Sequence, residues 1–323
     1  MLLSIIIPQY KETDKEVKRL LSSIDYQVNV NWEEVEVIIV NDCSKTLLSE
    51  SVLNSFENIK PKYIKLKKNV GPGLARQAGL DAAQGEYVTF CDADDMYHNF
   101  GVFSLYFAKI KESHPDIIRT QWLEELEIKN VKQYITHNFE VTWMHGKVFN
   151  RGFLYLNNIR FSDKLLYHED SYILSNAFEI TKNVIDIPVI TYIWTFDKTS
   201  ITRRNNGAYG YKSMPEFIRS ITFSLDWLKN KKEEVLMAKT VQLFLYIYYV
   251  LQANQKNWEK KYVEEIEKEL VNTYRKYGKY IQEIDLASFS ALEVQERQKI
   301  ANIPFVQSET FSQFLNRIVE QYK

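Results

Sequence analysis

The sequence predicts an α/β fold in which helices cover both faces of a mostly parallel sheet, followed by an all-α region. Between residues 2 and 113, short runs that are apolar throughout alternate with segments of helical periodicity, which is typical of buried parallel strands joined by helices. Polar residues follow the strands at their carboxyl ends. Strand patterns then stop after about Asn206, and helical periodicity dominates from Tyr211 to the C-terminus.

The first predicted elements alternate regularly. Strands are expected at residues 2–7, where Pro8 would end the first one, and at 35–40, 63–66 and 87–91. The first helix follows Thr13, which can form a capping box with Glu16. Further helices are expected at residues 47–56, 72–83 and 99–113.

The pattern changes after residue 116. Shorter, alternating segments over residues 116–143 predict antiparallel strands at the sheet edge. A helix is expected at 171–180, and strands around Pro188 within 184–194. Residues 203–210, with Asn205-Asn206-Gly207 inside them, are the best linker candidate. We therefore expect one domain over residues 1–206 and a helical one over 207–323.

Composition narrows the class of protein. The 323 residues are 45% hydrophobic and 26% charged, with a formal net charge of −1, which describes a globular chain and gives no electrostatic case for nucleic acid as a partner. Cys43 and Cys91 make no disulfide framework, which suits a reducing cytosol. Residues 1–8 are too short for a signal peptide, and the apolar run 241–253 is short of the ~20 residues that a bilayer needs. We expect no membrane span, while peripheral attachment stays open.

Three acids stand directly behind the fourth predicted strand, at Asp92, Asp94 and Asp95. In open α/β sheets, ligands bind at the carboxyl ends of the strands. Carboxylates this close repel one another unless a cation or hydrogen-bond donors lie among them, and a divalent ion with a substrate diphosphate would satisfy them. The alternative is a turn in which the acids only cap a helix.

Polar residues also follow other strands. Tyr10, two residues after Pro8, can border a slot for a nucleotide base, and Asp42 can accept hydrogen bonds from a base or ribose. Each has a simpler interpretation, a strand stop and a helix cap. Gly71 begins a tight turn into a helix whose free N–H groups can face an anion. Arg76, one turn later, can reach a phosphate or a carboxylate. Neither GxxxxGK[ST] nor GxGxxG is present.

Two further motifs lie in the second half of this region. Trp143 offers a flat apolar face of the kind that packs against sugars, or it is a core residue of an edge strand. His168-Glu169-Asp170 opens a predicted helix, so a carboxylate here can act as a general base or merely cap the helix. Basic and hydroxyl residues at 198–204 suit diphosphate contacts, a lid or a solvated linker.

Taken together and in this order, these motifs resemble family 2 of the glycosyltransferases, inverting enzymes with the GT-A fold, a Rossmann-like fold of nucleotide-diphospho-sugar transferases. The resemblance covers residues 1–204. The residues that carry it are Ser4 to Tyr10, Val40 to Ser44, Asn69 to Gly71 with Ala75-Arg76, Asp92 to Asp95, Trp143 with Gly146-Lys147, and Glu169-Asp170.

The resemblance implies roles for individual residues. Asp170 would be the catalytic base, supported by Glu169, and Asp94, with Asp92, would hold Mn²⁺ or Mg²⁺. The remaining assignments fall into three groups. Nucleotide-sugar contacts are assigned to Pro8, Tyr10, Glu12, Asp42, Gly71, Arg76, Asp92, Ala93 and Asp94; the acceptor side to Trp143, Lys147 and His168; and a diphosphate loop to Lys198, Ser200 and Arg203.

The expected function is metal-dependent, inverting transfer of a hexosyl or N-acetylhexosaminyl group. The donor would be a nucleotide-sugar, usually a UDP-sugar, and the acceptor a hydroxyl of a glycan or polyol-phosphate polymer of cell-wall, capsular or teichoic type. The sequence departs from the family at Gln9 and Gln77, and the Gln-x-x-Arg-Trp motif of processive members is missing, which favours single additions. A cytoplasmic location is expected, with contact to the cytoplasmic face of a membrane left open.

Two alternatives stay open at this point. A nucleotidyltransferase, or another sugar-nucleotide enzyme with a similar sheet, would generally carry a Gly-rich, basic loop after the first strand, where residues 9–12 contain no glycine. A non-catalytic binding protein would work through the C-terminal helices, which can also join copies of the chain into a homo-oligomer.

Overall fold

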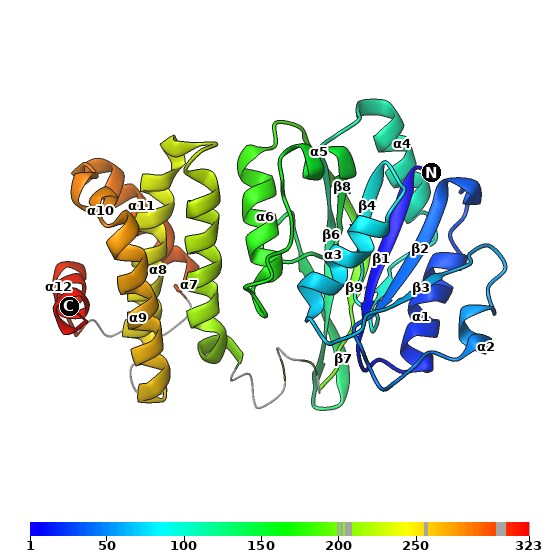
Figure 1. The fold of residues 1–323 in the computed structure, drawn as a ribbon, viewed down its shortest axis with the longest axis horizontal. Helices are drawn as coiled ribbons and strands as arrows, with labels where there is room; N and C mark the ends of the chain where they lie inside the picture. Colours follow the sequence, from blue (N-terminus) through cyan, green and yellow to red (C-terminus); the bar gives the residue numbers. More distant parts are fainter. Residues whose placement is uncertain (199, 201–202, 204–208, 255–257, 302–307, 323) are drawn as a thin grey trace. The chain divides into compact units, whose positions relative to one another are not determined.

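The computed structural model of the protein describes residues 1–198, 200, 203, 209–254, 258–301 and 308–322. The chain forms two units, Met1–Lys198 and Thr199–Lys323. The first holds a mixed sheet with helices, and the described part of the second is helical (Figure 1). The expected division after residue 206 is not tested, because residues 204–208 lie outside the described part.

A nine-stranded sheet forms the centre of the described first unit, in the order β3-β2-β1-β4-β8-β6-β9-β5, with β7 beside β6 (Figure 1). Strands β3, β2, β1 and β4 are parallel, β8 is antiparallel to both of its neighbours, and β9 runs parallel to β6. The strands are β1 (Leu3–Gln9), β2 (Val35–Asn41), β3 (Lys62–Lys65), β4 (Tyr87–Phe90), β5 (Met96–Tyr97), β6 (Ile117–Ile128), β7 (Val131–His137), β8 (Lys147–Asn150) and β9 (Val184–Trp194).

Helices cover both faces of this sheet, as predicted. On one face, Leu3, Ile5 and Ile7 of β1 are fully buried in a cluster with apolar residues of α1 (Asp14–Asp25) and α4 (Val102–Ser113). On the other face lies α3 (Pro72–Ala82), where Gly79 approaches so closely that an added Cβ would lie 2.3 Å from a methyl group of Ile6. The capping box of Thr13 and Glu16 at the start of α1 is confirmed.

Pro8 does not end β1, contrary to the prediction. The strand continues to Gln9, with Pro8 opposite Val40 of β2. Along β1 the backbone groups of Ile6 point toward β4, since Cys91 N–H donates to the Ile6 carbonyl, whereas the Gln9 carbonyl accepts from Asp42. Pro8 therefore faces the β4 side, beyond the last β4 residue that pairs with β1. Its missing N–H removes no ladder bond there.

Helix α2 (Glu50–Leu53) is much shorter than the predicted 47–56. The Ser49 hydroxyl caps its start, and the helix ends at Asn54. Beyond it, the N–H groups of Asn58 and Ile59 donate to the carboxylate of Asp25 at 2.8 and 3.2 Å. These backbone groups are satisfied by a tertiary partner rather than by another helical turn.

The region after residue 116 also differs from expectation. Strands β6 and β7 form the predicted antiparallel hairpin, but β6 lies between β8 and β9, so of these two strands only β7 is an edge strand. The predicted strands of 184–194 are one strand, β9. Its register shifts between Ile187 and Ile190, which leaves Pro188 in a bulge where no ladder donor is needed. Two helices complete this unit beside the short α2: α5 (Arg151–Leu156) and α6 (Glu169–Ile180).

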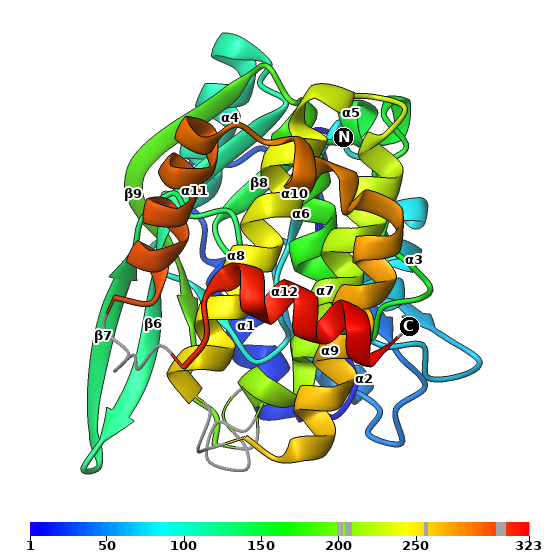
Figure 2. The same cartoon turned by 90° about the vertical axis from the view of Figure 1, so that its left-hand side faces the viewer.

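The predicted all-α region is confirmed for the described residues of the second unit. Its helices are α7 (Tyr209–Leu228), α8 (Leu236–Asn254), α9 (Lys260–Tyr277), α10 (Lys279–Glu283), α11 (Leu286–Lys299) and α12 (Phe311–Gln321). Helix α12 lies across α8 and α9 (Figure 2). It buries Phe314 and Ile318 completely in the core that α8 shares with its neighbours.

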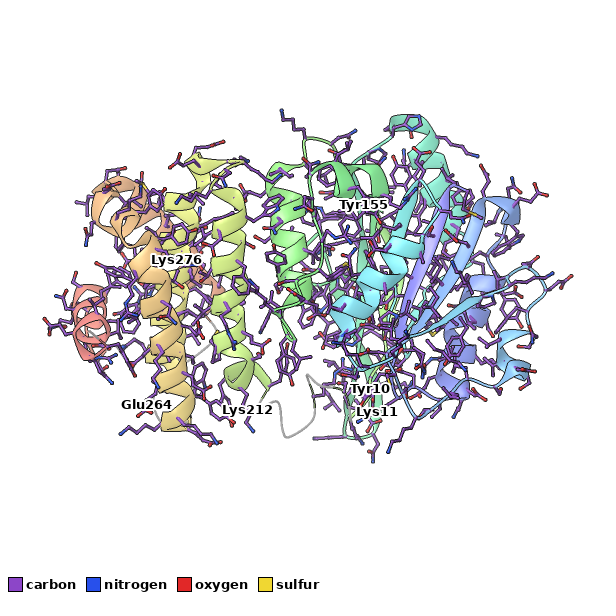
Figure 3. The ribbon with its side chains drawn as sticks, in the orientation of Figure 1. Tyr10, Lys11, Tyr155, Lys212, Glu264 and Lys276 are labelled. Carbon is purple, nitrogen blue, oxygen red and sulfur yellow. The ribbon has the colours of Figure 1, made fainter. Side chains whose placement is uncertain are left out.

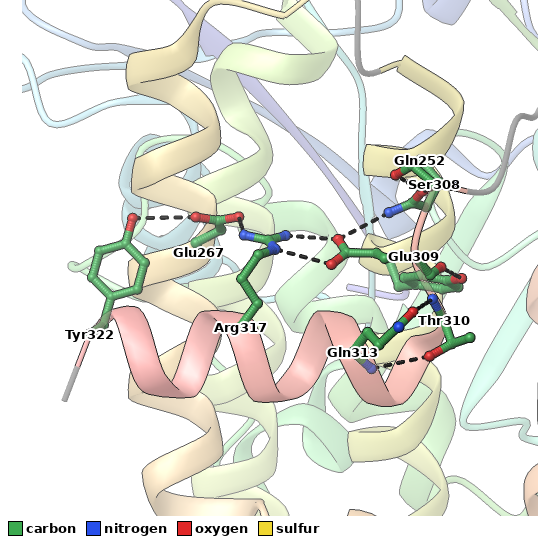
Figure 4. Close-up of polar contacts among 9 residues, drawn as sticks. Gln252, Glu267, Ser308, Glu309, Thr310, Gln313, Arg317 and Tyr322 are labelled. Carbon is green, nitrogen blue, oxygen red and sulfur yellow. Dashed lines mark hydrogen bonds and ion pairs between the residues drawn. The ribbon is translucent and has the colours of Figure 1, made fainter.

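A polar network holds α12 in place. The guanidinium of Arg317 pairs with the buried carboxylate of Glu267 on α9 at 2.7 Å and with Glu309 at 2.9 Å (Figure 4). Glu309 in turn accepts from Gln252 of α8 at 3.2 Å. Because these bonds join three segments, α12 is fixed by charge as well as by apolar packing.

One helical stretch in the described part of the chain, Glu233–Ala253, is long and apolar enough to cross a membrane by length and composition. This helical stretch begins eight residues before the apolar run 241–253 counted from the sequence, and the added residues include Glu233, Glu234 and Lys239. In this structure 61% of the tested window is buried, and Phe244, Leu245 and Ile247 lie wholly within the helical core. A core helix passes the same test of length and composition.

Candidate active site

The carboxyl ends of β1 and β2 are tied together by side-chain amides. Asn41 donates to the side-chain oxygen of Gln9, and the hydroxyl of Tyr63 on β3 lies 3.0 Å from the Asn41 amide. This places the residues that follow β1 and β2 side by side. The departure from the family pattern at Gln9 therefore has a structural role in this chain.

Asp42 anchors the loop that precedes α3. Its two carboxylate oxygens accept the N–H groups of Val70 at 2.7 Å and Gly71 at 2.8 Å. Gly71 has φ +86°, and an added Cβ would approach Leu166 within 2.9 Å, so only glycine fits this helix start without strain. The predicted contact of Asp42 with a base is untested; the observed contacts fix the loop beside it.

A tight turn follows β1. The carboxylate of Glu12 accepts the N–H groups of Tyr10 at 2.7 Å and Lys11 at 3.2 Å. Burial raises the pKa of Glu12 above its usual range. The Tyr10 ring is 42% exposed, with the Lys11 ammonium 5.2 Å from its centroid (Figure 3). Glu12 thus holds the turn, and the Tyr10 ring is left accessible at the end of β1.

Arg76 joins the two acidic motifs. Its Nη2 lies 2.6 Å from Asp92, at the end of β4, and its Nη1 lies 2.8 Å from Glu169, in the first turn of α6. The guanidinium is buried, which by itself would lower the pKa of Arg76, but the charges of Asp92 and Glu169 raise it above its ordinary value. Acids that are distant in the sequence therefore meet around one buried cation.

Glu169 and Asp170 begin α6 where α3 passes close by. An added Cβ at Gly73 would lie 2.7 Å from the Glu169 side chain, so the glycine lets the two helices approach. Asp170 is partly buried, and its Oδ1 accepts the N–H of Ser171 at 2.7 Å. Burial, then the neighbouring Glu169, raises the pKa of Asp170 to about 7. A general base works best when its pKa lies near the operating pH.

Asp92 and Asp94 differ in charge environment. Burial would raise the pKa of Asp92, but Arg76 and His145 outweigh it, and that pKa lies below its ordinary value. The pKa of Asp94 is raised to about 7 by burial and then by the charges of Asp92 and Glu12. Acidic groups therefore surround Asp94, and its hard carboxylate oxygens match a divalent cation such as Mg²⁺ or Mn²⁺.

The third acid of the motif has a structural role that the sequence did not indicate. Asp95 is fully buried, and its carboxylate accepts the hydroxyl of Tyr192 at 2.6 Å and the N–H of Thr195 at 2.8 Å. The same Tyr192 hydroxyl accepts the N–H of Asp92 at 3.0 Å. Tyr192 of β9 thus stabilises the turn that carries Asp92 and Asp94. Nothing in the sequence near residue 92 indicates that Tyr192 is its partner.

Replacing Tyr192 by phenylalanine tests this support. We expect metal and nucleotide affinity to fall several-fold, because the turn loses one donor and one acceptor and Asp95 keeps a buried carboxylate with one bond fewer. Tyr106→Phe is the matched control, since it removes a buried hydroxyl bonded to Thr191 of the same strand at 3.1 Å. Equal losses in nucleotide titrations of both variants would show that Tyr192 has no special role in the turn.

The sequence analysis also assigned no role to His145. Its ring stacks on Tyr192 with centroids 5.0 Å apart, and burial lowers the pKa of the imidazole to about 4, so it is neutral near pH 7. Ligand atoms of Asp92, Asp95 and His145 lie within 4.8 Å of one another. These three residues form a second candidate metal set, which shares Asp92 with the predicted pair.

The residues predicted for the acceptor side have mixed surroundings. Trp143 is half-buried, with its ring 5.1 Å from that of Trp194. Lys147 is buried and donates to the carbonyl of Trp143 at 2.5 Å, so it holds the preceding loop. His168 adopts φ +57° at the start of α6, and burial lowers its pKa to about 4. Their roles toward an acceptor are not tested.

The predicted diphosphate loop is only partly described. The ammonium of Lys198 pairs with Glu127 of β6 at 2.6 Å. Ser200 and Arg203 belong to the second unit, where the Arg203 N–H donates to the Ser200 carbonyl at 3.2 Å. Residues 199, 201–202 and 204 of the predicted loop lie outside the described part. This assignment stays a prediction.

Comparison with known proteins decides the family. Residues 4–162 match the family model described as Glycosyl transferase family 2. This segment, just under half of the chain, is a glycosyltransferase family 2 segment. The family 2 segment contains the residues predicted to contact the nucleotide-sugar, from Pro8 to Asp94, and the loop with His145. Glu169 and Asp170 lie just beyond its last matched residue.

Curated relatives support the same family. The poly(ribitol-phosphate) β-N-acetylglucosaminyltransferase TarS of Staphylococcus aureus strain Mu50 is 29% identical over 190 residues, covering 55% of this chain and 32% of TarS. The putative teichuronic acid biosynthesis glycosyltransferase TuaG of Bacillus subtilis strain 168 is 37% identical over 98 residues, covering 30% of this chain and 37% of TuaG. This chain thus spans about a third of the curated relatives' length.

Solved structures show the fold. S. aureus TarS 1–349 in complex with UDP-GlcNAc matches with a TM-score of 0.67 at 20% identity, over 96% of this chain and 98% of that one. The mannosyltransferase PcManGT of Pyrobaculum calidifontis, in complex with GDP-Man and Mn²⁺, matches with a TM-score of 0.51 at 11% identity, over 99% of this chain and 84% of that one. The predicted GT-A fold of the family 2 segment is confirmed.

Proposed function

We propose that the first unit transfers a hexosyl or N-acetylhexosaminyl group, with inversion, from a nucleotide-sugar to a hydroxyl of a cell-wall-type glycan or polyol-phosphate acceptor. The observation that carries the proposal is the buried Arg76 between Asp92 and Glu169, with Asp170 beside it at a pKa of about 7. TarS, a relative by sequence and fold, was solved with UDP-GlcNAc, which favours a UDP-sugar as the donor.

Asp170 is proposed as the general base. Its carboxylate takes the proton of the acceptor hydroxyl while that oxygen forms a bond to the anomeric carbon of the donor. The bond from this carbon to the diphosphate breaks through an oxocarbenium-like state, and the nucleoside diphosphate leaves on the opposite face. The negative charge of Glu169 and burial keep the Asp170 carboxylate basic enough for this step.

Asp94, with Asp92, is proposed to hold Mn²⁺ or Mg²⁺. When bound, such an ion acts as a Lewis acid that stabilises the leaving diphosphate. The acidic neighbours of Asp94, Asp92 and Glu12, fit this role. We favour this pair over the set with Asp95 and His145, because both oxygens of the fully buried Asp95 already accept hydrogen bonds.

Thermal unfolding with UDP and Mn²⁺ tests the proposed nucleotide and metal binding. A ligand present at about 100 times its Kd stabilises the folded state by about 2.7 kcal/mol, so the wild-type melting temperature should rise by several degrees. Asp94→Ala should lose most of this rise, whereas Asp81→Asn, an exposed aspartate paired with Arg160, should keep it. The melting temperature of Asp94→Ala could instead rise as much as that of the wild type, while Asp95→Asn or His145→Ala loses the rise. That result would indicate that Asp92, Asp95 and His145 hold the metal.

The products distinguish a transferase from the alternative chemistry. Incubation with a panel of nucleotide-sugars should release the nucleoside diphosphate and free sugar slowly, by hydrolysis, and faster when an acceptor is added. A nucleotidyltransferase would instead release inorganic diphosphate from a nucleoside triphosphate and a sugar 1-phosphate, which are supplied together in a parallel incubation. Single additions, a cytoplasmic location, contact with a membrane face and homo-oligomers through the helical unit stay predictions that this assay does not address.

A further inference from the structure

Five lysines lie in the edge strand β3 and in the residues on either side of it. Lys60, Lys62, Lys65, Lys67 and Lys68 are five of the chain's 41 basic residues, fall within nine positions, and have no acidic residue among them. All five side chains are exposed. Figure 1 shows β3 as the outermost strand at its end of the sheet. We call this group the lysine stripe.

None of the five lysines forms an ion pair with any residue in the described part of the chain. Lys65 lies over the ring of Tyr63, with its ammonium 5.4 Å from the centroid. Elsewhere on the surface, lysines such as Lys109 and Lys276 pair with nearby acids at 2.6 and 2.8 Å. The stripe therefore presents uncompensated positive charge on a chain whose overall charge is close to zero.

Protection of a sheet edge explains only part of this pattern. Lysines on an edge strand discourage pairing with a strand of another chain. Only two of the five, Lys62 and Lys65, lie inside β3. Lys60, Lys67 and Lys68 lie outside the strand, where there is no unpaired ladder to protect. They extend the positive charge beyond both ends of β3, with Lys67 and Lys68 in a bend after the strand. Lys62 and Lys65 are three residues apart, so their side chains lie on opposite faces of the sheet edge.

The stripe runs toward the proposed donor site. The Leu66 N–H donates to the Asn41 carbonyl at 2.9 Å, and the Asn69 amide donates to the Asp42 carbonyl at 3.2 Å. Lys67 and Lys68 are held between these two anchors. Their backbone therefore lies at the carboxyl end of β2, next to Asp42, which is predicted to contact the nucleotide base or ribose.

We propose that the lysine stripe binds a linear acceptor polymer with repeating anionic groups, phosphodiester or carboxylate, and guides it to the transfer site. This inference rests on the proposed function of the first unit. Positive charge on both faces of a sheet edge fits a flexible polymer that can follow this edge. A flat bilayer meets only one face, and its peripheral binders add an exposed apolar face. Tyr63 is the one aromatic residue among residues 60–68, and its hydroxyl bonds to Asn41, so a base-stacking platform for nucleic acid is missing from this segment.

The experiment compares two variants that lose the same charge. In the stripe variant all five lysines become glutamine. In the scattered control, Lys15, Lys18, Lys129, Lys182 and Lys229, which are all exposed, become glutamine. Binding is titrated with a poly(ribitol phosphate) chain, a polygalacturonate, a neutral glucan of matched length and vesicles containing phosphatidylglycerol. Donor hydrolysis without acceptor and the melting temperature are measured for each protein.

We expect the stripe variant to bind at least one of the two polyanions at least tenfold more weakly, with donor hydrolysis and melting temperature unchanged. The control should bind like the wild type. Wild-type affinity should fall by about 10–10²-fold between 50 and 200 mM salt, as counterion release at several contacts predicts. Which polyanion responds identifies the acidic group that is recognised.

Three results would overturn the inference. Equal losses in both variants would indicate a general charge effect, and a loss confined to vesicles would indicate a membrane surface. A raised KM for the donor in the stripe variant would place the lysines in nucleotide binding instead. Absence of donor hydrolysis in the wild type would count against the proposed function, and the polyanion titration would still decide whether the stripe is a binding surface.

Discussion

Asp170→Asn should lower sugar transfer by about 10²–10⁴-fold, the range that general-base catalysis contributes, while UDP binding stays within twofold of wild type. The amide keeps the size of the side chain but cannot take the acceptor proton. Asp163→Asn is the matched control, since Asp163 is an exposed aspartate shortly before α6. Near-normal turnover of Asp170→Asn in an assay of glycosyl product would exclude Asp170 as the base.

The same residue predicts a pH dependence. The base must be ionised, and the pKa of Asp170 is about 7, so transfer should rise as the pH increases through about 7. The free energy of unfolding should change with pH in the opposite direction to the transfer rate. Because the folded-state pKa lies above the ordinary value of 3.8, the contribution of Asp170 to the free energy of unfolding is complete below pH 4 and is lost as the pH rises to about 7. Asp170→Asn should therefore unfold at no lower temperature than the wild type at pH 8.

Arg76→Met should have the largest effect on folding, about 3–5 kcal/mol in the free energy of unfolding. The change leaves Asp92 and Glu169 as neighbouring acids without their shared cation. Arg160→Met is the control, because Arg160 pairs with Asp81 at an exposed site, where such pairs contribute about 0–1 kcal/mol. Denaturant unfolding of both variants measures the difference.

Acidification provides a second measurement on Arg76→Met. Without the guanidinium, the pKa values of Asp92 and Glu169 should rise, so both acids take up protons as the pH falls and their repulsion disappears. The loss of stability relative to the wild type should therefore shrink from pH 8 to pH 5. Adding Glu169→Gln should recover part of the loss at pH 8. A loss that does not change with pH, and is not relieved by Glu169→Gln, would mean that packing rather than charge explains the effect.

Local pattern was sufficient for the parallel half of the sheet. Apolar runs at β1, β2 and β4 are buried on both faces and therefore stand out in the sequence, and the Thr13–Glu16 capping box depends on residues only three apart. The carboxyl ends of parallel strands lie at one edge of a sheet. The sequence alone therefore predicted a common site for Tyr10, Asp42 and Asp92. The order of these motifs also indicated the family.

Partners that are distant in the sequence decided the rest. The sequence does not distinguish the three acids Asp92, Asp94 and Asp95. In the structure, Asp95 is buried and bonded to Tyr192, whereas Asp92 pairs with Arg76. Pro8 remains inside β1 because β4 has stopped pairing on that side, and Lys147 turns inward to hold a loop. The sequence alone determined which residues reach the carboxyl edge of the sheet, because that follows from strand order and periodicity. Only the tertiary structure determined which carboxylates are neutralised, buried or left basic, because that depends on charges and hydrogen-bond donors brought from other elements.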